Sequence, residues 1–372
     1  MKHLLLLGAG HAHVHVLEGL AAHPLSNVRV TLVAPQRGQL YSGMVPGFVA
    51  GHYTLDQCVI PLAALLARSG AQYLAGSGAS INAGAQTMTL SDGQTMSYDL
   101  LSVNTGSVMD RPKIEAAMPG ASEHALFVRP IEGFGKLWSD VAATAIKRPI
   151  HLAVVGAGAA GLELAMAAAH LLSQSKNAPS SRVTLITGGL PPAHSYPANV
   201  QRRVIHALER LRIAVVQDAC VGINATEVML NSGEKLGCDV PLLAIGAQAP
   251  GWLAGGDLAL DAHGFMTVNS FQQSTSHAQV FAAGDVASRL DTPHSRSGVY
   301  AVRAGAPLLR NLLAALSAQA LTAYVPPART LNLLSCGSRY AIAAWGRFSV
   351  EGAWVWKMKD QIDRKFVQRY SV

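Results

Sequence analysis

Apolar runs that end at glycine-rich turns are the main pattern along this chain. Residues 3–7 form the first run, the turn Gly8–His13 follows it, and residues 14–20 carry apolar side chains at helical spacing. A second apolar run at 28–33 closes the unit. This order predicts strand, turn, helix and strand, which is the βαβ unit of dinucleotide-binding folds.

The same pattern returns in the middle of the chain. The run 152–155 leads into the turn Gly156–Gly161, an alanine-rich helical stretch at 162–172 and a closing strand at 182–187. Two such units, each with its glycines between a strand and a helix, predict an α/β protein with two Rossmann-like dinucleotide-binding domains.

Both turns have the residue types that a bound diphosphate requires. The first glycine of each permits a tight turn, and the second, Gly10 or Gly158, lets the backbone approach the diphosphate at a helix N-terminus. His13 occupies the third glycine position of the first turn, so we expect helix and strand to pack less closely there than around Gly161.

Neither unit ends in the acidic residue that commonly binds a ribose. Ala34 follows the second strand of the first unit, and Gly188 and Gly189 follow that of the second. The choice between NADH and NADPH therefore stays open. Arg202 and Arg203 have two interpretations: they contact the 2′-phosphate of NADPH, or they lie solvated on an exposed helix face.

Composition restricts the class of protein. Half of the 372 residues are hydrophobic and only 14% are charged, so the chain can build a large core. The net charge is +7, but no nucleic-acid-binding module accompanies it, which favours anionic lipid or an anionic cofactor as the partner. The opening apolar run is too short for a signal peptide, and Glu163 interrupts the long apolar stretch 151–172, so no membrane-spanning helix is expected.

The cysteines lie far apart in the sequence. Their spacing matches neither a zinc site, nor a disulfide framework, nor a redox-active pair, and it is typical of a protein in the reducing cytoplasm. We therefore predict no metal site. The four are Cys58, Cys220, Cys238 and Cys336.

Two further motifs complete the pattern. A buried strand at 98–103 ends near Thr105 and Gly106, and a later strand runs into Gly284 and Asp285. The later motif resembles the FAD-closing signature of the pyridine-nucleotide-dependent flavoproteins, in which the aspartate binds the ribityl chain and the glycine leaves room for the diphosphate. The alternative is a turn whose aspartate only caps the next helix.

The resemblance extends over nearly the whole chain. It is strong for the branch that contains type II NADH dehydrogenases and sulfide:quinone oxidoreductases, and stronger for the flavoprotein module that accompanies selenophosphate synthetases. It implies an FAD-dependent NAD(P)H oxidoreductase. The stretches that carry it are Gly8–Val14, Tyr41–Gly47, Ser297–Arg303, Trp354–Trp356 and Lys359–Arg364.

The resemblance also implies a domain plan and two sets of site residues. FAD would bind a domain built from residues 1–110 and 268–322, NAD(P) would bind residues 111–267, and residues 323–372 would form a C-terminal region. A helix from Gly298 to Leu313 would point its N-terminus at the flavin. The residues expected at FAD are Gly8, Gly10, His11, Ala12, Pro35, Ser42, Gly43, Met44, Gly78, Thr105, Gly106, Gly284, Asp285, Gly298 and Val299. Those expected at NAD(P) are Gly156, Gly158, Ala159, Ala160 and Gly161.

The reaction that the resemblance implies is hydride transfer from a nicotinamide to the flavin, then electron transfer to a quinone or another small acceptor. Two alternatives stay open: a sulfide- or selenide-oxidising flavoenzyme that uses Cys336, and a flavin-binding module that assists selenophosphate synthetase. Cys336 is a weak catalytic candidate, because a lone cysteine is more often a buried apolar residue. Type II dehydrogenases carry Ala-Gln at their quinone site, where this chain has Gly298 and Val299.

The C-terminal stretch 351–372 combines aromatic and basic side chains. Met358, Ile362, Phe366 and Tyr370 recur every four residues and so share one face of a predicted helix. In the dehydrogenase relatives this region attaches the enzyme to a membrane. The face therefore either contacts an anionic membrane, at the inner side of the cytoplasmic membrane, or packs on the protein's own core. The sequence leaves open whether the chain forms a homodimer.

Overall fold

The computed structural model describes residues 1–371 and contains two parallel sheets of five strands each. In the first sheet, Leu4 and Leu6 of the central strand belong to one buried cluster, and Leu5 and Leu7 belong to another. Both faces of this sheet are thus covered, which explains why its strands are continuous apolar runs. The strand order is β19 (Val280–Ala282), β9 (Leu100–Val103), β1 (Lys2–Leu7), β2 (Val28–Ala34) and β5 (Gln72–Ala75).

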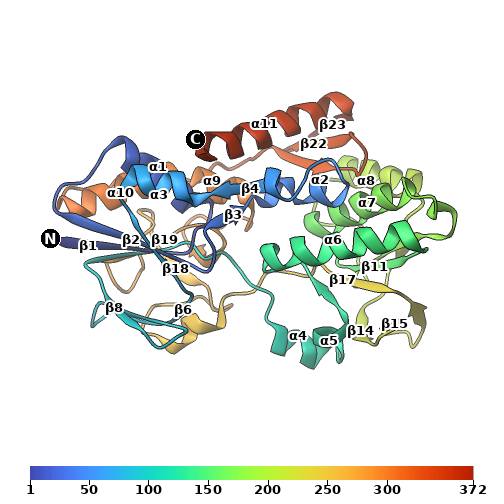
Figure 1. Ribbon diagram of the computed structural model, residues 1–372, viewed down its shortest axis with the longest axis horizontal. Coiled ribbons are helices and arrows are strands. Elements are labelled where there is room, and N and C mark those ends of the chain that lie inside the picture. The colour runs from blue at the N-terminus through green and yellow to red at the C-terminus, as the bar shows by residue number, and fades with distance from the viewer. Residues whose placement is uncertain (372) are drawn as a thin grey trace.

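The second sheet repeats this plan beside the first (Figure 1). Its central strand leads into the second glycine turn, as β1 leads into the first. The prediction of an α/β fold with two Rossmann-like sheets is confirmed. The strand order is β10 (Leu126–Phe127), β17 (Val240–Leu243), β11 (His151–Val155), β12 (Arg182–Ile186) and β13 (Ala214–Val216).

Long helices cover one face of each sheet, and a small antiparallel sheet lies on the other, joined in the second unit by two short helices. In the first unit the helices are α1 (His11–Ala22), α3 (Leu62–Ser69), α9 (Gly298–Arg303) and α10 (Gly305–Leu316), and the small sheet is β6 (Gly78–Asn82), β7 (Thr87–Leu90) and β8 (Thr95–Ser97). In the second unit they are α6 (Ile131–Lys147), α7 (Ala159–Ser173) and α8 (Ala198–Arg210), with β14 (Cys220–Ile223), β15 (Glu227–Leu230) and β16 (Lys235–Gly237). Shorter elements join these: β3 (Gly38–Leu40), α2 (Val45–Val49), β4 (Val59–Pro61), α4 (Arg111–Ala117), α5 (Ala121–His124), β18 (Met266–Val268) and β20 (Ala287–Arg289).

The single helix expected from Gly298 to Leu313 is two helices that meet at Ala304. The prediction of a continuous helix is wrong because Pro307 has no N–H group to donate to the carbonyl of Arg303, so one hydrogen bond of the helix is missing there. At the junction of the two helices, the carbonyl of Ala304 accepts two hydrogen bonds, one from Leu308 N and one from Nε2 of Gln272 at 3.1 Å.

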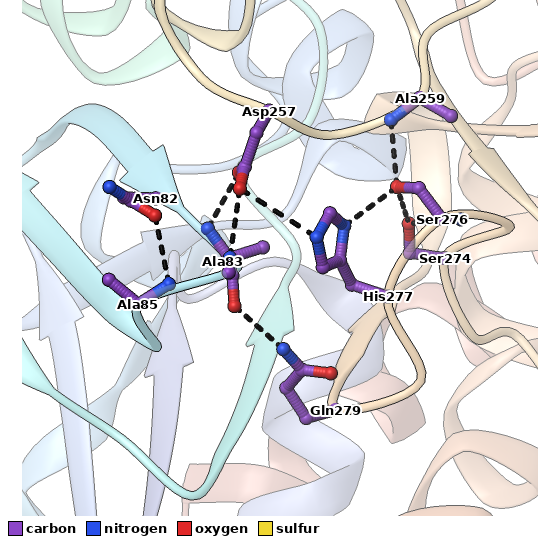
Figure 2. A network of polar contacts seen from close by, with 10 residues as sticks. Asn82, Ala83, Ala85, Asp257, Ala259, Ser274, Ser276, His277 and Gln279 are labelled. Carbon is purple, nitrogen blue, oxygen red and sulfur yellow. Dashed lines mark hydrogen bonds and ion pairs between the residues drawn. The ribbon is translucent and has the colours of Figure 1, made fainter.

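A network of polar contacts fastens the small sheet of the first unit to the returning chain (Figure 2). The carboxylate of Asp257 accepts from the backbone N–H groups of Ala83 and Gly84 at 2.6 and 2.8 Å, and it lies 3.7 Å from Nε2 of His277. Nε2 of Gln279 donates to the carbonyl of Ala83 at 2.7 Å. These contacts place the chain immediately before β19, whose C-terminal end leads to the Gly284–Asp285 turn.

A three-stranded antiparallel sheet and a long helix form the C-terminal region, which runs along the top of Figure 1. These elements are β21 (Asn332–Ser335), β22 (Ala341–Trp345), β23 (Phe348–Gly352) and α11 (Ala353–Ser371). Within residues 1–371, no helix combines the length and the apolar character needed to cross a bilayer.

The predicted apolar face of α11 packs mainly on the protein itself. Tyr370 is 2% exposed, and the ring of Phe366 stacks on Tyr41 with 4.5 Å between centroids. Met358 packs on a buried cluster of the C-terminal sheet, whereas Ile362 is 46% exposed. Of the two interpretations of this face, packing on the core is the one that the structure shows. Residue 372 lies outside the described residues.

Candidate functional site

A cleft of about 580 Å³ opens where β1, β2 and β9 end. This volume lies within the roughly 300–1,000 Å³ that is typical of cofactor sites. The structure brings together at this cleft most of the residues expected to bind FAD, from segments far apart in the chain. They are Gly8, Gly10, His11, Pro35, Ser42, Gly78, Thr105, Gly106, Gly284, Asp285 and Gly298.

The other four residues expected at FAD do not line this cleft. Ala12 is fully buried and its N–H group donates to the side chain of Asn104. Met44 is 1% exposed, and the carbonyl of Gly43 accepts from Nζ of Lys359 at 2.6 Å. Val299 is the second residue of α9 and directly follows Gly298.

The first glycine turn is held tightly against the end of β9. Gly8 has a φ of +88°, and a Cβ atom there would lie 2.6 Å from the carbonyl oxygen of Asn104. A Cβ atom at Gly10 would lie 2.3 Å from Oδ1 of the same residue. Glycine is therefore required at both positions because the backbone of one strand end packs directly on the other.

His13, in the third glycine position, fills the space between the helix and the sheet. Its Nδ1 lies 2.6 Å from the carbonyl of Gly8 and its Nε2 lies 2.8 Å from Oγ of Ser102. Burial lowers its pKa to about 4, so the ring is neutral at pH 7. In the second turn a Cβ atom at Gly161 would lie only 1.8 Å from the carbonyl of Gly156. The looser packing expected in the first turn is thus present.

Polar atoms at the wall of the cleft fit a polar cofactor. Nε2 of His11, Oγ1 of Thr105 and Oγ of Ser297 are buried and have no hydrogen-bond partner within residues 1–371. Burial lowers the pKa of His11 to about 4, and its Nδ1 donates to the carboxamide of Gln39, so Nε2 is left as an acceptor. Buried polar groups are rarely left unpaired. Donors such as the hydroxyl groups of FAD would satisfy this atom.

Asp285, which the sequence indicated, forms a polar cluster with Ser107 and Arg129, which it did not. Its Oδ2 accepts from Oγ of Ser107 at 3.2 Å and lies 3.4 Å from Nη2 of Arg129. Nη1 of Arg129 donates to the carbonyl of Ser107. Arg129 follows β10 of the second unit, so it links the two units across the cleft that both line. No short-range motif marks Arg129, because its partner lies 156 positions away.

The second glycine turn has the geometry of an open anion site. Gly156 has a φ of +118°, and nothing lies within 4 Å of a Cβ atom built at Gly158. No side chain caps α7, and within residues 1–371 the N–H groups of Ala159 and Ala160 have no acceptor. A helix N-terminus with free N–H groups favours a phosphate. All five residues expected at NAD(P) therefore lie together at this helix end.

The arginines proposed as readers of a 2′-phosphate differ in their contacts. Arg203 donates from Nη1 to Glu351 at 2.5 Å and from Nε to Ser349 at 3.1 Å. Arg203 thereby joins α8 to β23. It is neither solvated on an exposed helix face nor free to contact a 2′-phosphate, the two interpretations drawn from the sequence. Arg202 lies exposed on the same helix.

A buried ionic cluster, which the sequence analysis did not identify, lies between α7, α11 and the Ser42–Met44 loop. Nζ of Lys359 contacts Asp363 and the carbonyl of Gly43, each at 2.6 Å. Glu163 accepts from the N–H of Ser335 at 2.7 Å, and burial raises its pKa to about 7. Its carboxyl can therefore gain or lose a proton near neutral pH. In the sequence, Glu163 marked only the interruption of an apolar stretch.

Cys336 lies in a setting that suppresses thiol reactivity. It is fully buried, Sγ donates to the carbonyl of Leu334 at 3.7 Å, and burial raises its pKa to about 12. A nucleophilic cysteine requires the opposite, because only the thiolate reacts. The four cysteines are all free thiols.

Comparison with known proteins places the chain in a family. The model of the pyridine nucleotide-disulphide oxidoreductases matches residues 2–305. The oxidoreductase ptaL of Pestalotiopsis fici is 25% identical over 95% of this chain and 94% of its own length. An NADH dehydrogenase-like protein of Mycobacterium tuberculosis is 28% identical over 79% of this chain and 75% of that protein.

Solved structures agree on the fold. The sulfide:quinone oxidoreductase of Aquifex aeolicus superposes with a TM-score of 0.82 at 17% identity, over all of this chain and 92% of that one. NDH2 of Plasmodium falciparum in complex with NADH superposes with a TM-score of 0.81 at 13% identity, over all of this chain and 97% of that one. The chain therefore belongs to the pyridine nucleotide-disulphide oxidoreductase family and is an FAD-dependent oxidoreductase that uses NADH or NADPH.

Proposed function

We propose that the chain transfers reducing equivalents from NADH or NADPH, through FAD, to a quinone or another small acceptor. The observation that carries this proposal is the open helix end at Gly156–Gly161, which offers unpaired N–H groups to a second dinucleotide. Residues 1–110 and 268–322 would bind FAD, residues 111–267 would bind the nicotinamide nucleotide, and residues 323–372 would form an interface or membrane-surface region.

FAD supplies the hydride-accepting chemistry when it is bound. The chain supplies position and protons. Arg129 and Ser107 hold the carboxylate of Asp285 in a fixed place, which suits it to bind a hydroxyl group of the cofactor. Glu163, with a pKa of about 7, can store a proton in the cluster beside the Ser42–Met44 loop.

Anaerobic titration tests which electron donor reduces the flavin and whether a quinone reoxidises it. Under anaerobic conditions, the purified holoprotein is titrated separately with NADH, NADPH and sulfide while the flavin spectrum is recorded. We expect a nicotinamide nucleotide to bleach the flavin and a quinone to restore it. A flavin that dithionite reduces but neither nucleotide reduces would refute the proposal. Bleaching by sulfide that is lost in Cys336→Ser would support the sulfur chemistry instead, and stable retention of selenophosphate synthetase in a pull-down would support the partner role.

A membrane-dissolved acceptor would be reached through the exposed C-terminal surface rather than through the packed face of α11. Trp345, Phe348 and Trp354 are 51%, 72% and 58% exposed. Residues 323–372 also carry eight Lys or Arg and three Asp or Glu, so five of the seven excess positive charges lie here. Exposed aromatic and basic side chains together suit the surface of an anionic membrane.

Vesicle co-sedimentation tests this surface. We expect vesicles with anionic lipid to retain the protein and vesicles of neutral phosphatidylcholine to retain less. Phe348→Ser should weaken retention at least tenfold, because full burial of a large apolar side chain contributes about 1.5–3 kcal/mol. Leu290→Ser removes a side chain that is 64% exposed outside this surface and is the matched control. Equal loss in both variants would refute the assignment.

A further inference from the structure

The N-terminus of α1, the helix behind the first glycine turn, is already capped by the protein. Oδ1 of Asn104 accepts from the N–H groups of Ala12 and His13 at 3.1 and 3.2 Å. The backbone carbonyl of Asn104 accepts from Gly10 N at 3.1 Å. The carboxamide oxygen of Gln39, in the orientation that satisfies both of its ends, accepts from His11 N at 3.1 Å. Each N–H group from Gly10 to His13 thus has a partner within the chain.

The corresponding helix of the second unit differs in this respect. At the start of α7, the N–H groups of Ala159 and Ala160 have no acceptor within the described chain. Free N–H groups at a helix N-terminus ordinarily serve a bound phosphate. The two turns, similar in sequence, therefore differ in the donors that they offer to a diphosphate.

The carboxamide of Asn104 also reaches the chain that follows β19, the strand next to β9. Its Nδ2 donates to the carbonyl of Ala283 at 2.6 Å, and a Cβ atom at Gly284 would lie 2.7 Å from this nitrogen. Asn104 is 2% exposed and all of its polar side-chain atoms are paired. From the end of β9, this one side chain thus joins the first turn of α1 to Ala283, the residue before the Gly284–Asp285 turn.

We propose that Asn104 is a positioning residue for FAD, whose carboxamide joins the start of α1 to the end of β19 and fixes the two glycine turns at the spacing that FAD requires. The inference rests on FAD occupying this cleft. Because the cap belongs to the protein, the cleft keeps its shape before FAD arrives. Loss of the carboxamide would leave the N–H groups of Ala12 and His13 and the carbonyl of Ala283 unpaired, and the two turns would no longer be held together.

FAD binding to the apoprotein tests this role. Asn104→Ala should raise the Kd of FAD at least tenfold and reduce the increase in Tm that saturating FAD produces. Asn104→Asp keeps the acceptor for both N–H groups, but it loses the donor to Ala283 and adds a negative charge near the diphosphate. We expect it to raise the Kd of FAD and that of ADP, which carries a diphosphate without the flavin. This second variant also serves if Asn104→Ala does not fold.

Asn311→Ala is the matched control. Asn311 is fully buried and its carboxamide makes three hydrogen bonds, to Phe271 and Thr322, away from the cleft. It should lower Tm of apoprotein and holoprotein equally and leave the Kd of FAD unchanged. The same behaviour in both Asn104 variants, or tighter FAD binding by Asn104→Ala, would overturn the proposal. A native protein that binds no FAD would instead overturn the assignment of the cleft to FAD.

Discussion

Replacement of Glu163 by glutamine should change how the stability of the protein depends on pH. Burial raises the pKa of this carboxyl from 4.5 to about 7, and the nearby ammonium of Lys359 is already paired with Asp363. At about 1.4 kcal/mol per pKa unit, this difference corresponds to roughly 3 kcal/mol. The folded state binds the proton more tightly than the unfolded state. The contribution to stability is therefore fully present below pH 4.5 and is lost as the pH rises through 7.

Glu163→Gln removes this proton site but keeps an oxygen that can accept from Ser335 N. The assay is urea denaturation of the FAD-loaded native protein and the variant at intervals from pH 5 to pH 8.5. The free energy of unfolding of the variant, minus that of the native protein, should increase by roughly 2–3 kcal/mol over this range. Taking the difference cancels the other titrating groups. Glu234→Gln, at an exposed glutamate in the turn between β15 and β16, is the matched control. A difference for Glu163→Gln that stays constant across the range would refute the reasoning.

Three further predictions follow from the contacts described above. Gly161→Ala places a Cβ atom 1.8 Å from the carbonyl of Gly156. Reduction of the flavin by NADH and NADPH should therefore slow at least tenfold in this variant while FAD stays bound. Gly237→Ala, where no atom lies within 4 Å of the new Cβ atom, is its control, and a normal rate of flavin reduction in Gly161→Ala would contradict the prediction. Arg129→Ala removes the ion-pair partner of Asp285 and should weaken FAD binding several-fold in a fluorescence titration. Arg148→Ala, which breaks the ion pair with Asp239, is the control and should leave FAD binding unchanged. Equal affinities of the two variants for FAD would count against the role of Arg129. Lys359→Met leaves Asp363 without its ion-pair partner in the interior and should lower the free energy of unfolding by about 3 kcal/mol. Addition of Asp363→Asn should recover most of this loss. A loss below about 1 kcal/mol in Lys359→Met would show that the pair is not buried as described.

The sequence predicted the parts of the fold that depend on local pattern. Apolar runs before Gly8 and Gly156 identified the central strands of both sheets, since strands covered on both faces must be apolar throughout. The glycine spacing identified both helix starts. The pattern does not mark the break at Ala304, because the apolar spacing continues past Pro307 even though this residue cannot donate a helical hydrogen bond.

The site depended more strongly on contacts between distant residues. Asn104 meets Ala12 and Ala283, which lie 92 and 179 positions away, and Arg129 meets Asp285 at a separation of 156. No spacing rule links such residues, because their proximity arises only when parallel strands align their ends at one edge of a sheet. Glu163 likewise acquired its raised pKa only when α11 and the C-terminal sheet covered it.

The sequence by itself determined that the chain has two dinucleotide-binding turns, each between a strand and a helix, because hydrophobic periodicity and glycine placement are local properties. Only the tertiary structure decided what each turn offers a ligand. Asn104 and His13 close the first turn with the protein's own hydrogen bonds, whereas Ala159 and Ala160 leave the second open. The tertiary structure also decided the place of α11. Helical periodicity shows that a helix has an apolar face, but what covers that face depends on the rest of the fold.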